Sequence, residues 1–170
     1  RHAPARARVA RMSAAAVAAG GEVRVFAQYD RDFVEEADVV FHQAAQPGVR
    51  KSWGSSFDEY VRCNVAATQL LLEAVTASRN RPRVVYASSS SVYGEAPAYP
   101  CTETDLPRPR SPYGVTKLAA EQLCYLYHVN HGVPTVALRY FTVYGPRQRP
   151  DMGFNRFFSA ILAGTPVIQY

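Results

Sequence analysis

The sequence has few cysteines, almost no lysine and no long apolar run. Its three cysteines, Cys63, Cys101 and Cys124, are an odd number without metal-ligand spacing. This excludes a disulfide framework and predicts free thiols in a reducing, cytoplasmic location. No stretch approaches the roughly 20 apolar residues of a transmembrane helix, so no membrane span is expected. The length of 170 residues predicts one domain with a sizeable core.

Acidic residues are missing from the start of the chain, where none precedes Glu22. Residues 1–22 are rich in alanine and arginine, and residue 1 is not methionine. We interpret this segment as an atypical start to a truncated chain, outside the fold. The formal charge of +5 comes from 17 arginines and two lysines against 14 acids. Because no nucleic-acid-binding motif accompanies this charge, we expect no nucleic-acid partner, and an anionic small molecule suits it better.

Apolar segments of strand and helix length alternate along the chain, which predicts an α/β protein with a doubly wound parallel sheet. We expect buried strands at 39–42, 83–87 and 135–139, a strand at 22–27 and a final strand at 166–170. The predicted helices are 55–78, 112–131 and 153–163.

Polar side chains follow the predicted strand 83–87, where Ser88 to Ser91 supply four hydroxyl groups. Ligands of open α/β sheets bind at the carboxyl ends of strands. Tyr113 and Lys117 are four residues apart on the next helix and therefore share a face. An ammonium beside a phenol is expected to lower the pKa of Tyr113, which could then take a proton from a sugar hydroxyl.

These features resemble the extended short-chain dehydrogenase/reductases, the NAD-dependent epimerase/dehydratase family. The matching segments occur in the family's order over residues 38–170: His42-Gln43-Ala44-Ala45, Asn64, Ser88 to Gly94, Tyr113 with Lys117, and Arg139 to Pro146. The resemblance implies a Rossmann-like NAD-binding domain over 23–145 and the start of a substrate-binding lobe over 146–170. It also implies that His42 is structural.

The same resemblance assigns roles to individual residues. Ser89, Tyr113 and Lys117 would be catalytic. NAD would contact Ala44, Ala45, Gln46, Asn64, Tyr113, Lys117 and Phe141. The nucleotide sugar would contact Ser89, Ser90, Ser91, Thr142 and Arg149. No metal is implied.

A glycine-rich phosphate-binding loop is absent from the sequence. Such a loop follows the first strand of a dinucleotide-binding domain and receives the pyrophosphate. The simplest explanation is that the amino-terminal third of this domain is missing. We therefore expect a sheet truncated at both ends and a fragment that is inactive by itself.

Four positions narrow the reaction type within the family. Related 4,6-dehydratases and decarboxylases carry acids where this sequence has Ser90 and Ser91, which leaves epimerisation at C4. Thr142 and Arg149 resemble UDP-glucuronate 4-epimerases, and a guanidinium suits a C6 carboxylate. The alternatives are a UDP-glucose/galactose 4-epimerase and an inactive fragment that acts at most as a binding module. Family members often form homodimers through a four-helix bundle, which here would involve helices 55–78 and 112–131.

Overall fold

The computed structural model describes residues 31–95 and 99–167. The predicted strand at 22–27 and the atypical start at 1–22 lie outside the described residues. The predicted final strand lies partly outside them, and residues 165–167 have no regular structure. The first described helix, α2 (Arg31–Glu36), leads directly into the sheet.

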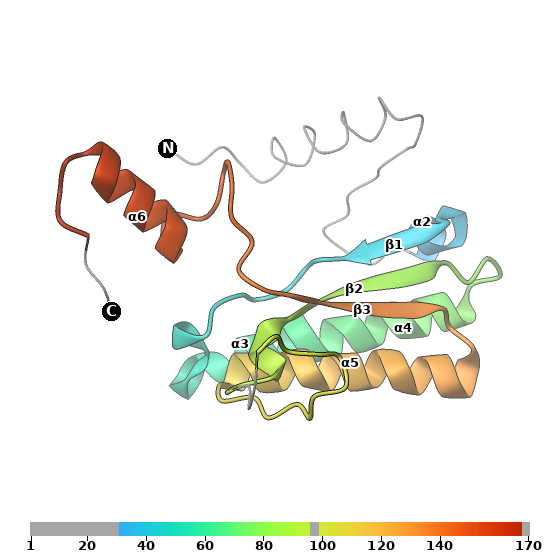
Figure 1. The fold of residues 1–170 in the computed structure, drawn as a ribbon. Helices are drawn as coiled ribbons and strands as arrows, with labels where there is room; N and C mark the ends of the chain where they lie inside the picture. The colour runs from blue at the N-terminus through green and yellow to red at the C-terminus, as the bar shows by residue number, and fades with distance from the viewer. Residues whose placement is uncertain (1–30, 96–98, 168–170) are drawn as a thin grey trace.

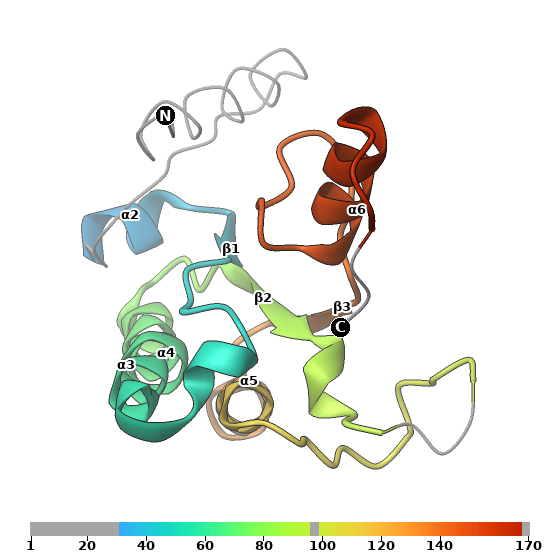
Figure 2. The same cartoon turned by 90° about the vertical axis from the view of Figure 1, so that its left-hand side faces the viewer.

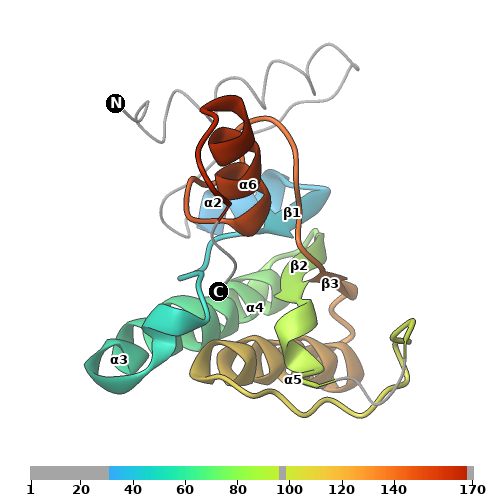
Figure 3. The ribbon, with the colours of Figure 1, turned by 60° about the vertical axis from the view of Figure 1, so that its left-hand side comes forward.

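The described strands form one parallel sheet in the order β1-β2-β3. They are β1 (Val39–His42), β2 (Arg83–Ser89) and β3 (Thr135–Tyr140). Helices α4 (Ala67–Ala77) and α5 (Pro112–His131) connect the strands and lie side by side on one face of the sheet (Figures 1 and 3). This arrangement confirms the predicted Rossmann-like parallel sheet.

The core lies between the sheet and these two helices. Alternate residues of β2 point toward the helices, and Val84 and Tyr86 are at most 1% exposed. They pack with buried residues of α4 and α5, which include Leu71, Leu72, Val75, Ala120, Cys124 and Tyr127. The period-two pattern of β2 therefore fixes which face of the strand meets the helices.

The prediction that the other two strands are buried is wrong. Phe41 of β1 is 66% exposed, and Val136, Leu138 and Tyr140 of β3 are also exposed. The physical reason is that the described helices cover only one face of the sheet, and that β1 and β3 are its outer strands. The positions of the strands follow from local sequence, whereas their exposure depends on which elements lie against them.

The predicted single helix over 55–78 is also wrong in detail. The segment begins with a 3-10 turn, Gly54–Ser56, followed by α3 (Phe57–Tyr60), the π-helical segment η3 (Val61–Ala66) and α4. Asn64 lies in the π-helical segment and is buried. The Thr68 hydroxyl donates a hydrogen bond to the Asn64 carbonyl over 2.7 Å. Segments of this kind are often found at functional sites.

Helix α5 confirms its prediction, including both ends. The Ser111 side chain accepts a hydrogen bond from the Gly114 backbone N–H over 3.1 Å, which caps the amino terminus. Gly132 ends the helix in the left-handed conformation at φ +69°. At Gly114 a Cβ atom would lie 2.6 Å from the Ser91 carbonyl oxygen, so only glycine permits this close approach to the end of β2.

The last helix, α6 (Gly153–Leu162), lies beyond the carboxyl ends of the strands (Figures 1 and 2) and agrees with its prediction to one residue. Within the described ranges, no helix is both long and apolar enough to span a bilayer.

Candidate functional site

The carboxyl end of β2 and the first turns of α5 bring Ser89, Tyr113 and Lys117 together. Figure 2 views the molecule toward this end of the sheet. Ser89 is the last residue of β2, and its hydroxyl acts to lower the pKa of Tyr113 against the larger effect of burial. Its Oγ also accepts the Ser91 backbone N–H over 3.2 Å, which caps the 3-10 turn Ser90–Val92. The strand end, this turn and the helix start therefore form one compact unit.

The expected lowering of the Tyr113 pKa by Lys117 is wrong for this structure. Burial raises the pKa of Tyr113 above its ordinary value, and the Ser89 hydrogen bond and the positive charge of Arg149 act against this rise. The Lys117 ammonium lies 6.0 Å from the centroid of the Tyr113 ring. Desolvation of the phenolate therefore outweighs the favourable contacts.

Lys117 is almost fully buried, with 3% of its surface exposed. Its Nζ donates a hydrogen bond to the Ala87 carbonyl over 2.9 Å and lies 5.0 Å from the centroid of the Tyr86 ring. Burial lowers the pKa of Lys117 to about 8. An ammonium has three N–H donors, so the one hydrogen bond made within the described residues leaves two for a bound molecule.

Hydrogen bonds from the side chains of Asn64 and Tyr60 hold the backbone that follows β1. Asn64 Oδ1 accepts the Gln46 N–H over 2.7 Å, and Asn64 Nδ2 donates to the Gln46 carbonyl over 3.2 Å. The Tyr60 hydroxyl reaches the carbonyls of Pro47 and Gly48, at 3.1 and 2.8 Å. The small residues Ala44 and Ala45, which directly precede this tied segment, leave its backbone accessible.

Asn64 also connects this segment to helix α5, which carries Tyr113. Its Nδ2 donates to Thr116 Oγ1 over 3.0 Å, and that hydroxyl donates to the Tyr113 carbonyl over 2.8 Å. Both partners lie in the first two turns of α5. The same amide therefore fixes the loop after β1 and the helix that carries Tyr113.

His42 lies in the core below the site. It is 4% exposed, and its Nε2 is hydrogen bonded to Thr68 Oγ1 at 2.9 Å. Burial and, to a smaller extent, the charge of Lys117 lower the pKa of His42 to about 4. The imidazole is therefore neutral at pH 7, which agrees with a structural rather than a catalytic role.

This neutral histidine predicts a dependence of stability on pH. Below pH 6.5 the unfolded chain binds a proton at His42 that the folded chain does not bind until about pH 4, so stability is lost as the pH falls through this window. Between pH 7 and 5 the free energy of unfolding should fall by about 2 kcal/mol more than in His42→Gln, which does not titrate. Denaturant unfolding at each pH measures this, and equal slopes for the two proteins would contradict a neutral buried His42.

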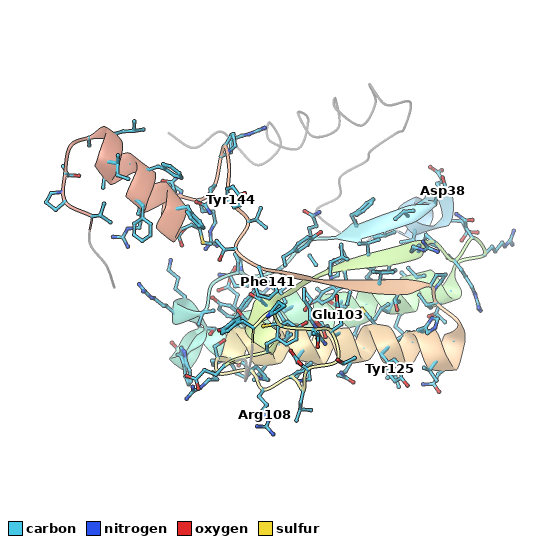
Figure 4. The ribbon with its side chains drawn as sticks, in the orientation of Figure 1. Asp38, Glu103, Arg108, Tyr125, Phe141 and Tyr144 are labelled. Atoms are coloured by element: carbon cyan, nitrogen blue, oxygen red, sulfur yellow. The ribbon has the colours of Figure 1, made fainter. Side chains whose placement is uncertain are left out.

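The predicted substrate-side residues surround the same end of the sheet. Ser90 and Ser91 are half-buried in the turn after β2. Phe141, labelled in Figure 4, follows β3 and is 58% exposed, with its ring centroid 6.3 Å from that of Tyr93. Thr142 is exposed next to it.

Arg149 lies in the segment between β3 and α6. Its Nη2 forms an ion pair with Asp151 at 3.1 Å, and 43% of its side chain is exposed. Burial raises the pKa of both Tyr113 and Tyr60, and the charge of Arg149 opposes this rise in each case. The guanidinium is therefore close enough to act electrostatically on the phenol of Tyr113.

Four residues of this region were not identified from the sequence. Tyr60 supports the loop after β1, and Thr116 supports the start of α5. Glu121 of α5 and Arg139 of β3 form an ion pair. The spacing of Glu121, four residues after Lys117, is the one local signal that could have placed it on the face of α5 that carries Tyr113 and Lys117. The others are recognised only once distant segments are brought together.

No cluster of three or more potential metal ligands occurs in residues 31–95 and 99–167, and all three cysteines are free thiols. The site is therefore built from hydroxyl, phenol, ammonium, amide and guanidinium groups.

Comparison with known proteins gives a consistent family. Residues 10–170 match the family model described as the NAD dependent epimerase/dehydratase family. A Bacillus subtilis protein named as the uncharacterized UDP-glucose epimerase YtcB is 51% identical over 134 residues, which cover 79% of this chain and 42% of that protein. UDP-glucuronate 4-epimerase 1 of Arabidopsis thaliana is 42% identical over 132 residues, covering 77% of this chain and 30% of the relative.

Solved structures agree with these relatives. The UDP-glucuronic acid 4-epimerase of Bacillus cereus, in complex with UDP-glucuronic acid and NAD, is 50% identical with a TM-score of 0.75. The match covers 81% of this chain and 43% of that one. This chain therefore spans less than half the length of each of these three relatives. Since the family model covers almost all of the sequence, the chain belongs to the NAD-dependent epimerase/dehydratase family.

Proposed function

We propose that this chain is the catalytic part of an NAD-dependent 4-epimerase that interconverts UDP-glucuronate and UDP-galacturonate. The observation that carries the proposal is the meeting of Ser89, Tyr113 and Lys117 at the carboxyl end of β2. The charge of Arg149, which acts on Tyr113, supports an anionic substrate beside the phenol. Relatives that bind UDP-glucuronic acid and NAD support the choice of substrate and cofactor.

The residues present fit a dinucleotide. The backbone after β1, with its small Ala44 and Ala45, offers a flat surface that Asn64 fixes through Gln46. Lys117 has two N–H donors left for the ribose hydroxyls next to the nicotinamide, and Phe141 is exposed at the same end of the sheet. The chemistry supplied by bound NAD is the reversible acceptance of a hydride from C4.

The proposed reaction uses Tyr113 as the general base. Tyr113 acts in its ionised form, which burial disfavours and which the Ser89 hydroxyl and the charge of Arg149 favour. It takes the proton of the 4-hydroxyl while the C4 hydrogen leaves as hydride, so the C4–O bond becomes a carbonyl. Ser89 shares the hydrogen bond to the same oxygen, and the 4-keto sugar then turns within the site. In the return step C4 regains the hydride on its other face, and Tyr113 gives the proton back to the oxygen.

Arg149 would bind the C6 carboxylate in this scheme. A guanidinium can hold a carboxylate with two parallel hydrogen bonds. Such a grip orients the 4-keto intermediate, which is a β-keto acid and loses CO₂ if its carboxylate is free to rotate. In this proposal the substrate carboxylate replaces Asp151, which is the partner of Arg149 in the structure.

The proposal includes a division of the chain. We infer that residues 23–145 are part of the NAD-binding domain and that residues 146–170, with α6, begin the substrate-binding lobe. Activity then requires a polypeptide of the relatives' full length that contains this chain, which we call the complete enzyme. The free thiols Cys63, Cys101 and Cys124 support a reducing compartment such as the cytoplasm.

The experiment that tests the function is a comparison of substrates with the complete enzyme. UDP-glucuronate, UDP-glucose and UDP-xylose are incubated separately with NAD⁺, and the products are resolved by chromatography and NMR. We expect UDP-galacturonate as the main product, formed with a much higher kcat/KM than UDP-galactose. Preferential turnover of UDP-glucose would instead establish the galactose-type epimerase. Absence of any product would favour a binding module.

We also infer that the complete enzyme forms a homodimer through α4 and α5. Apolar residues of these helices remain exposed on the side away from the sheet, where Figure 4 labels Tyr125. Leu70, Tyr125, Leu126 and Val129 are 58, 65, 49 and 59% exposed. Two such helix pairs would bury these residues in a four-helix bundle.

Leu126→Glu should convert this dimer into a monomer, because it places a charge in an apolar interface. Sedimentation velocity at several concentrations measures the change. The matched control is Leu106→Glu, which alters a leucine of the loop before α5 that is also exposed, at 67%. A parent enzyme that is monomeric at high concentration would refute the dimer.

A further inference from the structure

Glu121 is a buried carboxylate without a part in the proton transfer described above. It lies on α5 with 7% of its surface exposed. Arg139 of β3 forms a two-pronged ion pair with it, through Nη2 at 2.9 Å from Oε2 and Nε at 3.0 Å from Oε1. The Ser88 hydroxyl donates a third hydrogen bond to Oε1. All three side chains are at least half-buried in the layer between the sheet and α5.

These contacts form a continuous series along the end of β2. Three consecutive strand residues each act on one residue of α5. Ala87 accepts a hydrogen bond from Lys117, Ser88 donates one to Glu121, and the Ser89 hydroxyl acts to lower the pKa of Tyr113 against burial. The helix residues are spaced four apart and therefore lie on one face. Glu121 is the last of the three along α5, and Lys117 and Tyr113 lie nearer to the carboxyl end of β2.

Arg139 extends the same series to the segments around the site. Its guanidinium carbon lies 4.8 Å above the centroid of the Tyr93 ring, in the turn that follows Ser89. Its Nη1 donates to the Glu103 carbonyl over 3.3 Å, and Figure 4 shows Glu103 in the loop near the sheet end. The ion pair with Glu121 raises the pKa of Arg139 further, so its charge is permanent.

Stability of the fold does not by itself explain why an ion pair occupies this place. Burying two charges costs solvation energy, and apolar residues of equal volume often replace such pairs without loss. An apolar pair, however, would not direct Ser88 Oγ or hold the guanidinium over Tyr93. The arrangement therefore has a specific geometric effect at the strand end, one residue from Ser89.

We propose that Glu121 is a positioning residue for the epimerase reaction. Through Ser88 and Arg139 it fixes the end of β2. It thereby holds Ser89, and the Ala87 carbonyl that binds Lys117, in place relative to Tyr113. The inference rests on the proposed function for its kinetic test. Glu121 itself touches neither substrate nor cofactor.

The test compares Glu121→Gln with the parent in the complete enzyme. The amide keeps the size of the side chain but cannot accept both prongs of Arg139. Because small displacements of reacting groups are costly, we expect kcat to fall about 10- to 100-fold while KM changes less than about threefold. A displaced Ser89 hydroxyl would also oppose the burial-driven rise of the Tyr113 pKa less, so the rising limb of the kcat–pH profile should move to higher pH.

Tyr127→Phe is the matched control. Tyr127 is a buried residue of the same helix, and its hydroxyl bonds to Glu73 and Gln69 away from the site. Removal of the Tyr127 hydroxyl should lower the melting temperature and leave kcat and the kcat–pH profile unchanged. If Glu121→Gln behaves like this control, the positioning role is refuted.

A second variant covers the case in which Glu121→Gln does not fold. Ser88→Ala removes one hydrogen bond and leaves the ion pair intact. It should lower kcat and shift the pH profile in the same direction, and an unchanged profile would overturn the proposal.

Failure of the proposed function is separable from failure of this inference. If the parent enzyme epimerises no UDP-sugar, amide hydrogen exchange of residues 87–93 still tests whether Glu121 fixes the end of β2. The inference predicts faster exchange there in Glu121→Gln and parent-like exchange in Tyr127→Phe. Equal protection in all three proteins contradicts it.

Discussion

Replacing Tyr113 by phenylalanine should lower kcat of the complete enzyme by about 10²- to 10⁴-fold, the range for loss of a positioned general base. The phenol is the group that takes the 4-hydroxyl proton in the proposed reaction, and the substitution removes only its oxygen. Because the ring remains, the contact of Tyr113 with the Tyr60 ring, whose centroid is 6.2 Å away, is retained. NAD⁺ and UDP-glucuronate should therefore still bind with affinities close to those of the parent.

Tyr125→Phe is the appropriate control, since Tyr125 lies on the same helix and is 65% exposed. Its kcat should equal that of the parent. Steady-state kinetics and calorimetric titration of both ligands measure the two variants. A Tyr113→Phe enzyme with full turnover would remove Tyr113 from the mechanism.

Arg149→Ala should lower kcat/KM for UDP-glucuronate roughly 10- to 100-fold, which corresponds to a charge-assisted hydrogen bond of about 1.5–3 kcal/mol. UDP-glucose has a neutral C6 hydroxyl and should be affected far less. Part of the keto intermediate should also lose CO₂ and yield a UDP-pentose. Kinetics with both substrates and mass spectrometry of the products measure these effects.

Arg108→Ala serves as the control for this prediction, because Arg108 is exposed and Figure 4 shows its side chain directed away from the sheet. Equal losses on both substrates would place Arg149 on the shared diphosphate. The galactose-type 4-epimerase would then be the better assignment.

The parts of the fold that depend on local signals were predictable. Helix α5 begins and ends as expected because Ser111, Pro112 and Gly132 act within a few residues of themselves. The exposure of β1 and β3 was not predictable, since Phe41 and Leu138 are apolar and only the arrangement of neighbouring elements decides what covers them. The π-helical segment at Asn64 has no evident sequence signal.

The candidate site shows the same difference between local and distant interactions. The spacing of Tyr113 and Lys117 predicts a shared face, and the structure confirms it. The spacing does not reveal the burial of the two side chains. This burial raises the pKa of Tyr113 and lowers the pKa of Lys117. The ion pair of Glu121 with Arg139 joins a helix to a strand 18 residues later, and no periodicity reports such a contact.

The most direct test of the central claim is the fate of the C4 hydrogen. The complete enzyme is incubated with UDP-glucuronate and NAD⁺ in D₂O, and the product is examined by proton NMR. Transient oxidation at C4 predicts UDP-galacturonate that retains hydrogen at C4, because the hydride leaves and returns without exchange with solvent. Deuterium at C4 of the product would contradict the account.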